Sequence, residues 1–185
     1  MTATGRQQAE QAAIAELLQF RDLYNNGGLR KIGLGQPRTY NPGERLLLRV
    51  AQLARRRVAL DADEGAVARR EFLDDPSPLR SQGTLYVTDE RAVFLGNRRK
   101  PLGEWRWNEL EATTVIHGYA GVRFIVSGGD DASDAVLHVD RPLVVLDRPP
   151  QGVAIQMMQI EAASVLGMGR NYDAWIAGLP ERWTN

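Results

Sequence analysis

Apolar and polar residues alternate through the middle of this chain in short runs separated by polar turns. The clearest run spans residues 83–96, where Leu85 and Val87 fall on one face of a strand. The segment from Arg91 to Leu95, after the Asp89-Glu90 turn, is too apolar to face water and needs a covering layer, because a lone hairpin is only marginally stable. The pattern predicts strands at 83–88, 91–96, 102–107, 111–116, 121–127 and 134–140. Short strands with hairpin-length connections indicate an antiparallel sandwich or barrel.

Two other segments carry apolar residues at helical spacing. Residues 6–25 form the first predicted helix, and Thr4 with Gln7 fits a capping box at its start. Residues 151–166 form the second, which has two apolar faces, with a short strand at 153–157 as the competing interpretation. One face, expected to cap the sheet, consists of Ile155, Met158, Ala162 and Val165. The other is a candidate interface, expected to meet either the N-terminal helix or a second copy of the chain, and consists of Val153, Met157 and Ile160.

Residues 44–60 fit two periodicities. Leu46, Leu48 and Val50 alternate as in a strand, whereas Leu47, Val50 and Leu53 also suit a helix, so the pattern leaves the choice open. Residues 27–43 contain five glycines and two prolines and are predicted to be a loop. We therefore divide the chain into an N-terminal helix with a Gly/Pro-rich linker (1–43), a central domain that includes the second helix (44–166) and a C-terminal extension (167–185).

Composition narrows the class of protein. The 185 residues are 43% hydrophobic and 25% charged, as expected for a globular chain. The 23 basic and 23 acidic residues balance, which argues against a nucleic-acid partner. All but two basic residues are arginine, typical of a GC-rich, bacterial genome. The N-terminus has no apolar signal region and no stretch is long enough to span a bilayer, so we expect a cytoplasmic location.

No catalytic or metal-binding set is visible. The absence of cysteine excludes disulfides and thiolate metal sites. His117 and His138 are the only histidines, and neither stands in a spacing typical of a metal site or of a serine hydrolase. We predict no catalytic residues, no metal and no cofactor, and therefore a protein that is not an enzyme.

The run Gly83-Thr-Leu-Tyr-Val-Thr-Asp-Glu-Arg-Ala-Val-Phe-Leu-Gly96, followed by Glu104-Trp-Arg-Trp107, resembles the pleckstrin-homology (PH)-like superfold, in particular its GRAM-type and bacterial branches. These families carry a Gly-x-Leu-Tyr-x-Thr-x-x-Arg-x-x-Phe hairpin and then a tryptophan strand. The resemblance covers residues 44–166 and is detailed over 83–110. It implies a mainly β fold with flanking helices: a partial barrel of two antiparallel sheets, capped by a C-terminal helix.

The residues themselves support the same fold. Trp105 and Trp107 stand two apart, so both point to one face of a strand and anchor a core there. We expect Arg91 to lay its stem along the sheet and to pair with a carboxylate.

The lack of a catalytic set, together with more apolar helical surface than one small barrel covers, predicts a non-enzymatic binding module, and PH-like folds commonly bind an extended peptide along a sheet edge or the C-terminal helix. We expect protein–protein interaction, with self-association as one form of it. A first alternative is a peripheral module that binds anionic phospholipid at the inner face of the membrane, although the acidic Asp89-Glu90 turn departs from phosphoinositide-binding domains. A second is a small-ligand carrier or enzyme with a barrel pocket near Tyr86 and Trp107. The candidate membrane or partner contacts are Arg98, Arg99, Lys100, Arg55, Arg56 and Arg57.

Overall fold

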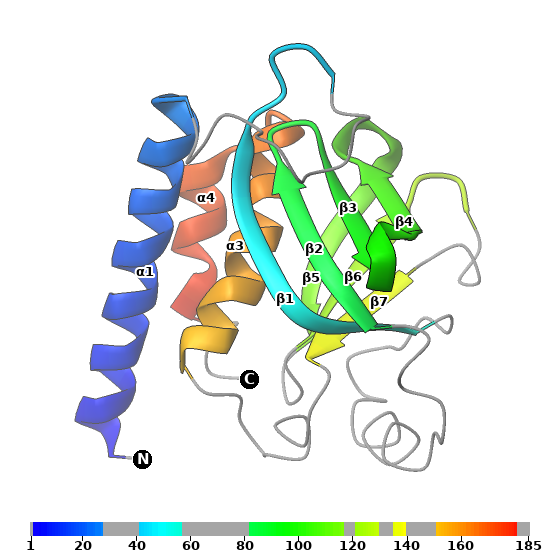
Figure 1. Ribbon diagram of the computed structural model, residues 1–185. Helices are drawn as coiled ribbons and strands as arrows, with labels where there is room; N and C mark the ends of the chain where they lie inside the picture. Colours follow the sequence, from blue (N-terminus) through cyan, green and yellow to red (C-terminus); the bar gives the residue numbers. More distant parts are fainter. Residues whose placement is uncertain are drawn as a thin grey trace.

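The computed structural model describes residues 2–27, 41–56, 82–116, 121–129, 135–139 and 151–180. The described helices are α1 (Ala3–Asn25), α3 (Gln151–Gly167) and α4 (Tyr172–Ala177), with short 3-10 turns η3 (Asn97–Arg99) and η4 (Trp107–Glu109). The strands are β1 (Leu46–Arg56), β2 (Gln82–Thr88), β3 (Arg91–Gly96), β4 (Pro101–Arg106), β5 (Leu110–Ile116), β6 (Gly121–Val126) and β7 (Ala135–Val139). Figure 1 shows the three helices on one side of the strands.

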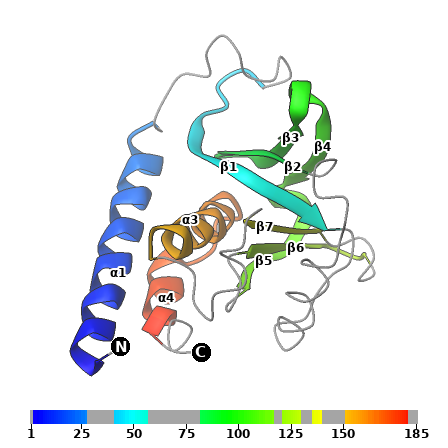
Figure 2. The ribbon, with the colours of Figure 1, turned by 60° about the horizontal axis from the view of Figure 1, so that its bottom comes forward.

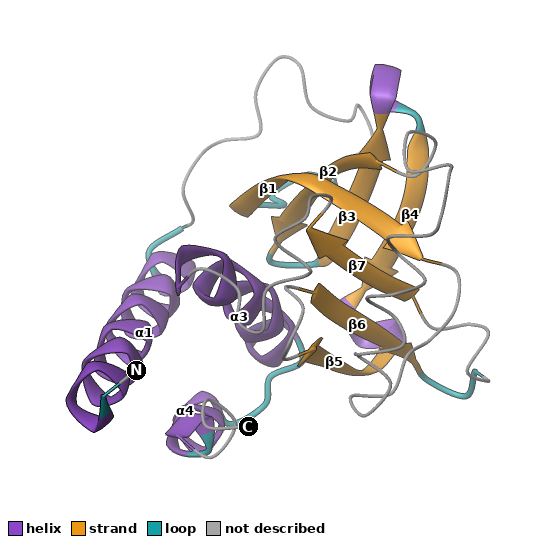
Figure 3. Ribbon diagram, turned by 90° about the horizontal axis from the view of Figure 1, so that it is seen from below, coloured by secondary structure: helices purple, strands orange, loops and turns teal. Residues whose placement is uncertain are grey.

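The seven strands form one antiparallel sheet in the order β4-β3-β2-β1-β7-β6-β5. β1 is the shared strand, because its residues pair with β2 along most of its length and with β7 at its end. The register of β1 against β2 shifts between Val50 and Leu53, and Gln52 in that shift has a left-handed backbone with φ 59°. Such a bulge bends a strand. Figures 2 and 3 show β1 crossing from the β2–β4 half of the sheet to the β5–β7 half.

The inner face of the bent sheet carries the core. Leu85 and Val87 are fully buried, as predicted, and Ala92 to Leu95 are buried along β3. Trp105 and Trp107 both pack on Phe124 of the opposite half, with ring centroids 4.5 Å and 6.5 Å apart. The two tryptophans therefore tie the halves together, and their predicted structural role is confirmed.

The helices cover the open side of the sheet. α3 lies between α1 and the strands (Figure 2) and contacts both. An apolar stripe on α1 packs inward through Ala13, Leu17 and Phe20, as predicted from its helical spacing. The two apolar faces predicted for α3 are explained by this position, because a helix covered on two sides must be apolar on both.

The predicted fold class is confirmed: the protein is an α+β fold in which a seven-stranded antiparallel sheet is flanked by an N-terminal helix and C-terminal helices. The two expected sheets are halves of one continuous sheet, since β1 pairs with both. Within the undecided segment 44–60, Leu46–Arg56 is strand. Helix α1 starts earlier than predicted: Thr2, not Thr4, is its N-cap and accepts a hydrogen bond from the Gly5 amide at 3.3 Å.

Candidate functional site

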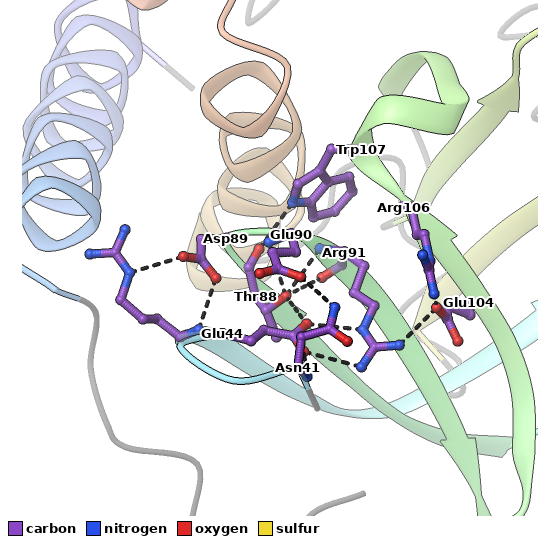
Figure 4. A network of polar contacts seen from close by, with 10 residues as sticks. Asn41, Glu44, Thr88, Asp89, Glu90, Arg91, Glu104, Arg106 and Trp107 are labelled. Atoms are coloured by element: carbon purple, nitrogen blue, oxygen red, sulfur yellow. Dashed lines mark hydrogen bonds and ion pairs between the residues drawn. The ribbon is translucent and has the colours of Figure 1, made fainter. Parts of the chain in front are cut away.

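The β2–β3 turn, between Thr88 and Arg91, is the centre of a buried polar network (Figure 4). The Arg91 guanidinium donates to both carboxylate oxygens of Glu44, from Nε at 2.9 Å and from Nη2 at 3.1 Å. The Thr88 hydroxyl contacts Glu44 Oε1 at 2.7 Å. These side chains are almost inaccessible to water, at 4% exposure for Arg91 and 0% for Glu44. The predicted pairing of Arg91 with a carboxylate is confirmed, in a bidentate geometry that is among the strongest of ion pairs.

The same turn holds the segment that enters β1. Asp89 accepts hydrogen bonds from the Arg45 backbone amide at 2.8 Å and from Arg45 Nε at 2.9 Å. The Asn41 side-chain amide donates to Glu90 at 2.6 Å. Residues 41–45 are therefore held against the hairpin by four side chains of the turn and its flanks, namely Thr88, Asp89, Glu90 and Arg91.

On the other side, Arg91 extends the network to β4. Its Nη1 donates to Glu104 at 2.8 Å, and Arg106 Nε donates to the same carboxylate oxygen at 3.2 Å. Burial by itself would raise the pKa of Glu104, but hydrogen bonds and positive charge from the two arginines outweigh it and hold that pKa below its usual value. For Arg91, burial would lower the pKa, and the bonds and charges of Glu44 and Glu104 reverse this and raise it. Both groups stay charged at neutral pH.

A cavity of about 290 Å³ opens beside this network. Its wall is formed by Asn41, Asp89, Glu90, Arg91, Arg106, Trp107, Asn108 and Gly167. Trp107 closes the floor: it is buried and its indole Nε1 donates to the Thr88 carbonyl at 3.0 Å. The cavity is polar and carries charges of both signs.

A basic tip lies at the opposite end of β3 and β4. This tip is the turn 97–100, which includes η3 and carries Arg98, Arg99 and Lys100, all exposed. The Gly96 amide donates to the Lys100 carbonyl at 2.8 Å and closes the turn. Arg98 and Arg99 both have a left-handed backbone, with φ 57° and 58°. Figure 3 shows the turn projecting beyond the two strands.

The second predicted basic cluster reaches the same end of the sheet. Strand register places Ala54 beside Gln82 of β2, and Gly83 beside Gly96 of β3, so the end of β1 and the basic tip share one end. Arg55 is half-buried: its Nη1 donates to the Leu102 carbonyl, and its guanidinium lies 5.4 Å from the centroid of Trp105. Of Arg56 only the backbone is described, at the last position of β1, and Arg57 lies outside the described residues.

The candidate interface on α3 is placed differently from the basic residues. Met157 and Ile160 are fully buried within the chain, and Val153 is half-buried. The N-terminal helix, one of the two partners expected for this face, packs on α3. In this conformation Met157 and Ile160 are not accessible to a second molecule.

Other candidate chemistry can be placed only in part. Among the described residues, no group of histidine, aspartate and glutamate is arranged to hold a metal ion. His117 and the side chain of His138 lie outside the described part of the chain. None of the helices that the structure describes has the length and apolarity to cross a bilayer.

Sequence reasoning did not find Glu44, the partner of the Arg91 side chain. Glu44 precedes the run of leucines at the start of β1 and belongs to no recognisable motif. The available signal was the Thr-x-x-Arg pattern of Thr88 and Arg91: two buried polar side chains on one turn require a buried acceptor. Which of the 23 acidic residues supplies it is decided by the tertiary structure.

Comparisons with known proteins identify no family for this chain. No family model matches the chain, and no curated protein matches it. The N-terminal PH domain of Vps36 is similar in structure, with a TM-score of 0.45 and 11% sequence identity, over 74% of this chain and 90% of that one. No function is carried over from this likeness.

Proposed function

We propose that the protein is a non-enzymatic binding module and that its basic tip docks an acidic segment of a protein partner. The observation that carries this proposal is the tip itself: Arg98, Arg99 and Lys100 are exposed, and two of them have a left-handed backbone.

The backbone geometry makes this choice of residues costly. A left-handed conformation costs roughly 1–2 kcal/mol for a residue with a side chain. Glycine or asparagine would occupy such positions at less cost. The two arginines at positions 98 and 99 therefore lower the stability of the fold while placing two cations at the end of the hairpin. Strain that brings no packing is typical of functional sites.

Arginine suits a carboxylate ligand at the tip, although it binds phosphate in the same geometry, so the case for a protein segment rests on the adjoining strand edge. Its guanidinium binds carboxylates in a bidentate geometry, which a lysine cannot do. The tip also leads directly into β4, which is a terminal strand of the sheet. An extended segment could add to the β4 edge and bring its acidic side chains to the tip, in the manner of strand addition.

The membrane alternative is weaker on the same observations. Each cation near an anionic bilayer contributes about 1 kcal/mol, so the three described cations give about 3 kcal/mol. That is less than the roughly 4 kcal/mol of a millimolar complex. Leu102, the large apolar residue next to the tip, is half-buried and packs against the core, so it is not presented for insertion.

Binding of a labelled eight-residue peptide that alternates valine and glutamate tests the proposal, measured by fluorescence anisotropy and amide NMR shifts. We expect saturable binding, weakened by salt, with shifts along 97–106. Arg98→Glu with Arg99→Glu should weaken it by about tenfold or more, because two charge-assisted contacts become repulsive.

The matched control is Arg49→Glu with Arg170→Glu, which changes the net charge equally at exposed arginines elsewhere. A further variant, Arg98→Gly with Arg99→Gly, removes the charges but suits the backbone, so it should lose binding while gaining stability. Equal losses in the tip and control variants would reject the proposal. Binding to anionic vesicles with no peptide binding would favour the membrane alternative instead.

A further inference from the structure

The cavity beside the β2–β3 turn is distinct from the basic tip. Its wall carries two carboxylates, Asp89 and Glu90, and two arginines, Arg91 and Arg106. Two further carboxylates, Glu44 and Glu104, bond to the wall residue Arg91, and three of these four carboxylates have an arginine partner. Glu44 pairs with Arg91, Asp89 with Arg45, and Glu104 with both Arg91 and Arg106. The fourth carboxylate is Glu90.

Glu90 has a neutral partner only. Its carboxylate accepts a hydrogen bond from the Asn41 amide at 2.6 Å, and within the described part of the chain it forms no ion pair. It is exposed at the cavity wall. Among the described residues of this network, Glu90 is therefore the one carboxylate without an arginine partner, and it is part of the cavity wall.

The remaining wall suits an alkyl stem with a polar end. Trp107 and Gly167 form its apolar part. The two residues lie so close together that a side chain on Gly167 would overlap the indole ring. Asn41 and Asn108 add amide groups that can accept or donate. Lysine and arginine side chains combine an apolar stem with a cationic head in this way.

We propose that this cavity accepts a cationic side chain, the ammonium of a lysine or the guanidinium of an arginine, with Glu90 as its counter-ion. Arg106 in the wall does not oppose this, since its Nε is bonded to Glu104 at 3.2 Å and its charge is shared with that carboxylate. The site lies at the end of β4 remote from the basic tip, because Arg106 is the last residue of that strand.

The inference does not depend on the proposed function of the tip. If both hold, a partner segment along β4 would be dipolar, with a basic residue at the cavity and acidic residues at the tip. The length of β4 separates them.

The test is an NMR titration of the full chain with N-acetyl-lysine amide and N-acetyl-arginine amide, using N-acetyl-norleucine amide as the uncharged probe. The Trp107 indole N–H and the Asn108 and Gly167 amides report on the cavity. We expect saturable shifts with a Kd on the order of millimolar for at least one cationic probe, and none for norleucine amide.

Glu90→Gln should lower the affinity for the cationic probe by about fivefold or more, because one partly exposed ion pair is lost. It is nearly isosteric and can still accept from Asn41, so the fold should be unchanged. Glu109→Gln, an exposed carboxylate of η4 outside the cavity wall, is the matched control and should bind as the parent does.

Unsaturable shifts, equal binding of norleucine amide, or equal affinities of the Glu90 and Glu109 variants would each overturn the proposal. Since none of these probes carries a free carboxylate, failure here leaves the docking of acidic segments at the tip unaffected. Conversely, if the acidic peptide does not bind at the basic tip, the proposal for this cavity is unaffected.

Discussion

At the scale of single residues, the Glu44–Arg91 pair explains why a turn of the hairpin carries Thr88 and Arg91. Removing one member of a buried ion pair typically costs about 3–5 kcal/mol, because the other is left charged and unpaired. The pair is thus a weak contributor of net stability but a strict selector of conformation: only the native register brings Glu44 against the turn. Its role is positional, holding residues 41–45 and the cavity wall in place.

Two glycines of α3 allow a matched test of packing at the same scale. Gly152 is exposed with open space around its α-carbon, whereas a side chain on Gly167 would overlap Trp107. Gly152→Ala should stabilise the protein by up to about 1 kcal/mol through helix propensity. Gly167→Ala should destabilise it by about 1–3 kcal/mol through overpacking. Urea denaturation measures both, and effects of the same sign would show that Gly167 does not meet the indole ring.

At the scale of elements, α4 is a short helix that contacts both α1 and α3. The Tyr172 hydroxyl donates to the Leu17 carbonyl of α1 at 2.7 Å, and the Trp175 indole donates to Glu161 of α3 at 2.8 Å. Asn171 caps α4 by accepting from the Ala174 amide at 3.0 Å. A helix of this length is not stable alone, so its position depends on these bonds and on the burial of Tyr172.

The hydrogen bond of Tyr172 makes the stability of the contact between α4 and α1 depend on pH. Burial raises the pKa of Tyr172 above its usual value, although the nearby positive charge of Arg21 lowers it somewhat. The folded chain holds the phenol proton of Tyr172 more tightly than the unfolded chain does. The protonated hydroxyl therefore stabilises the fold fully below a pH of about 10, and this stabilisation is lost as the pH rises beyond it.

Tyr172→Phe should therefore cost about 0.5–1.5 kcal/mol at neutral pH, the value of one hydrogen bond. It should also lessen the decline of stability above pH 10. Urea unfolding of both proteins at pH 7 and at pH 10.5 measures this. A difference that stays constant between the two pH values would contradict the buried position of the hydroxyl.

At the scale of the whole molecule, the bent sheet (here called the barrel) and the helices share one hydrophobic core. Ala13, Leu17 and Phe20 of α1 belong to the same cluster of buried residues as Trp105, Trp107 and Phe124 of the sheet. α3 mediates this continuity, since it contacts α1 on one side and the strands on the other. We therefore expect the N-terminal helix to unfold together with the barrel.

Phe20→Ala tests that cooperativity. Truncation of a buried phenylalanine typically costs about 3–5 kcal/mol. If α1 is part of one cooperative unit, the variant should lower the unfolding midpoint equally by far-UV circular dichroism and by near-UV signals from the tryptophans. Leu48→Ala, a half-buried position on β1, serves as a milder control. Separate transitions for helix and barrel would show that α1 is an appended element.

The sequence by itself determined the strands from residue 83 onward, because alternation with a period of two, interrupted by polar turns, is a local property. It also determined the two long helices, from an apolar stripe in α1 and two apolar faces in α3. The stretch 44–60 stayed undecided, since its leucines satisfy both periods. The structure makes it a strand by pairing Arg49 with Tyr86 and Arg55 with Leu137, contacts across more than thirty and eighty residues.

Only the tertiary structure decided the candidate sites. The tip was visible as a basic run, but its left-handed backbone and its place at the end of β4 were not. Of the cavity wall the sequence pointed only to Trp107, in a pocket expected to include Tyr86, because the wall comes from four separate stretches between Asn41 and Gly167 and does not include Tyr86. The physical reason is the same in each case: periodicity records which side of an element is buried, whereas the pairing of charges depends on which elements meet.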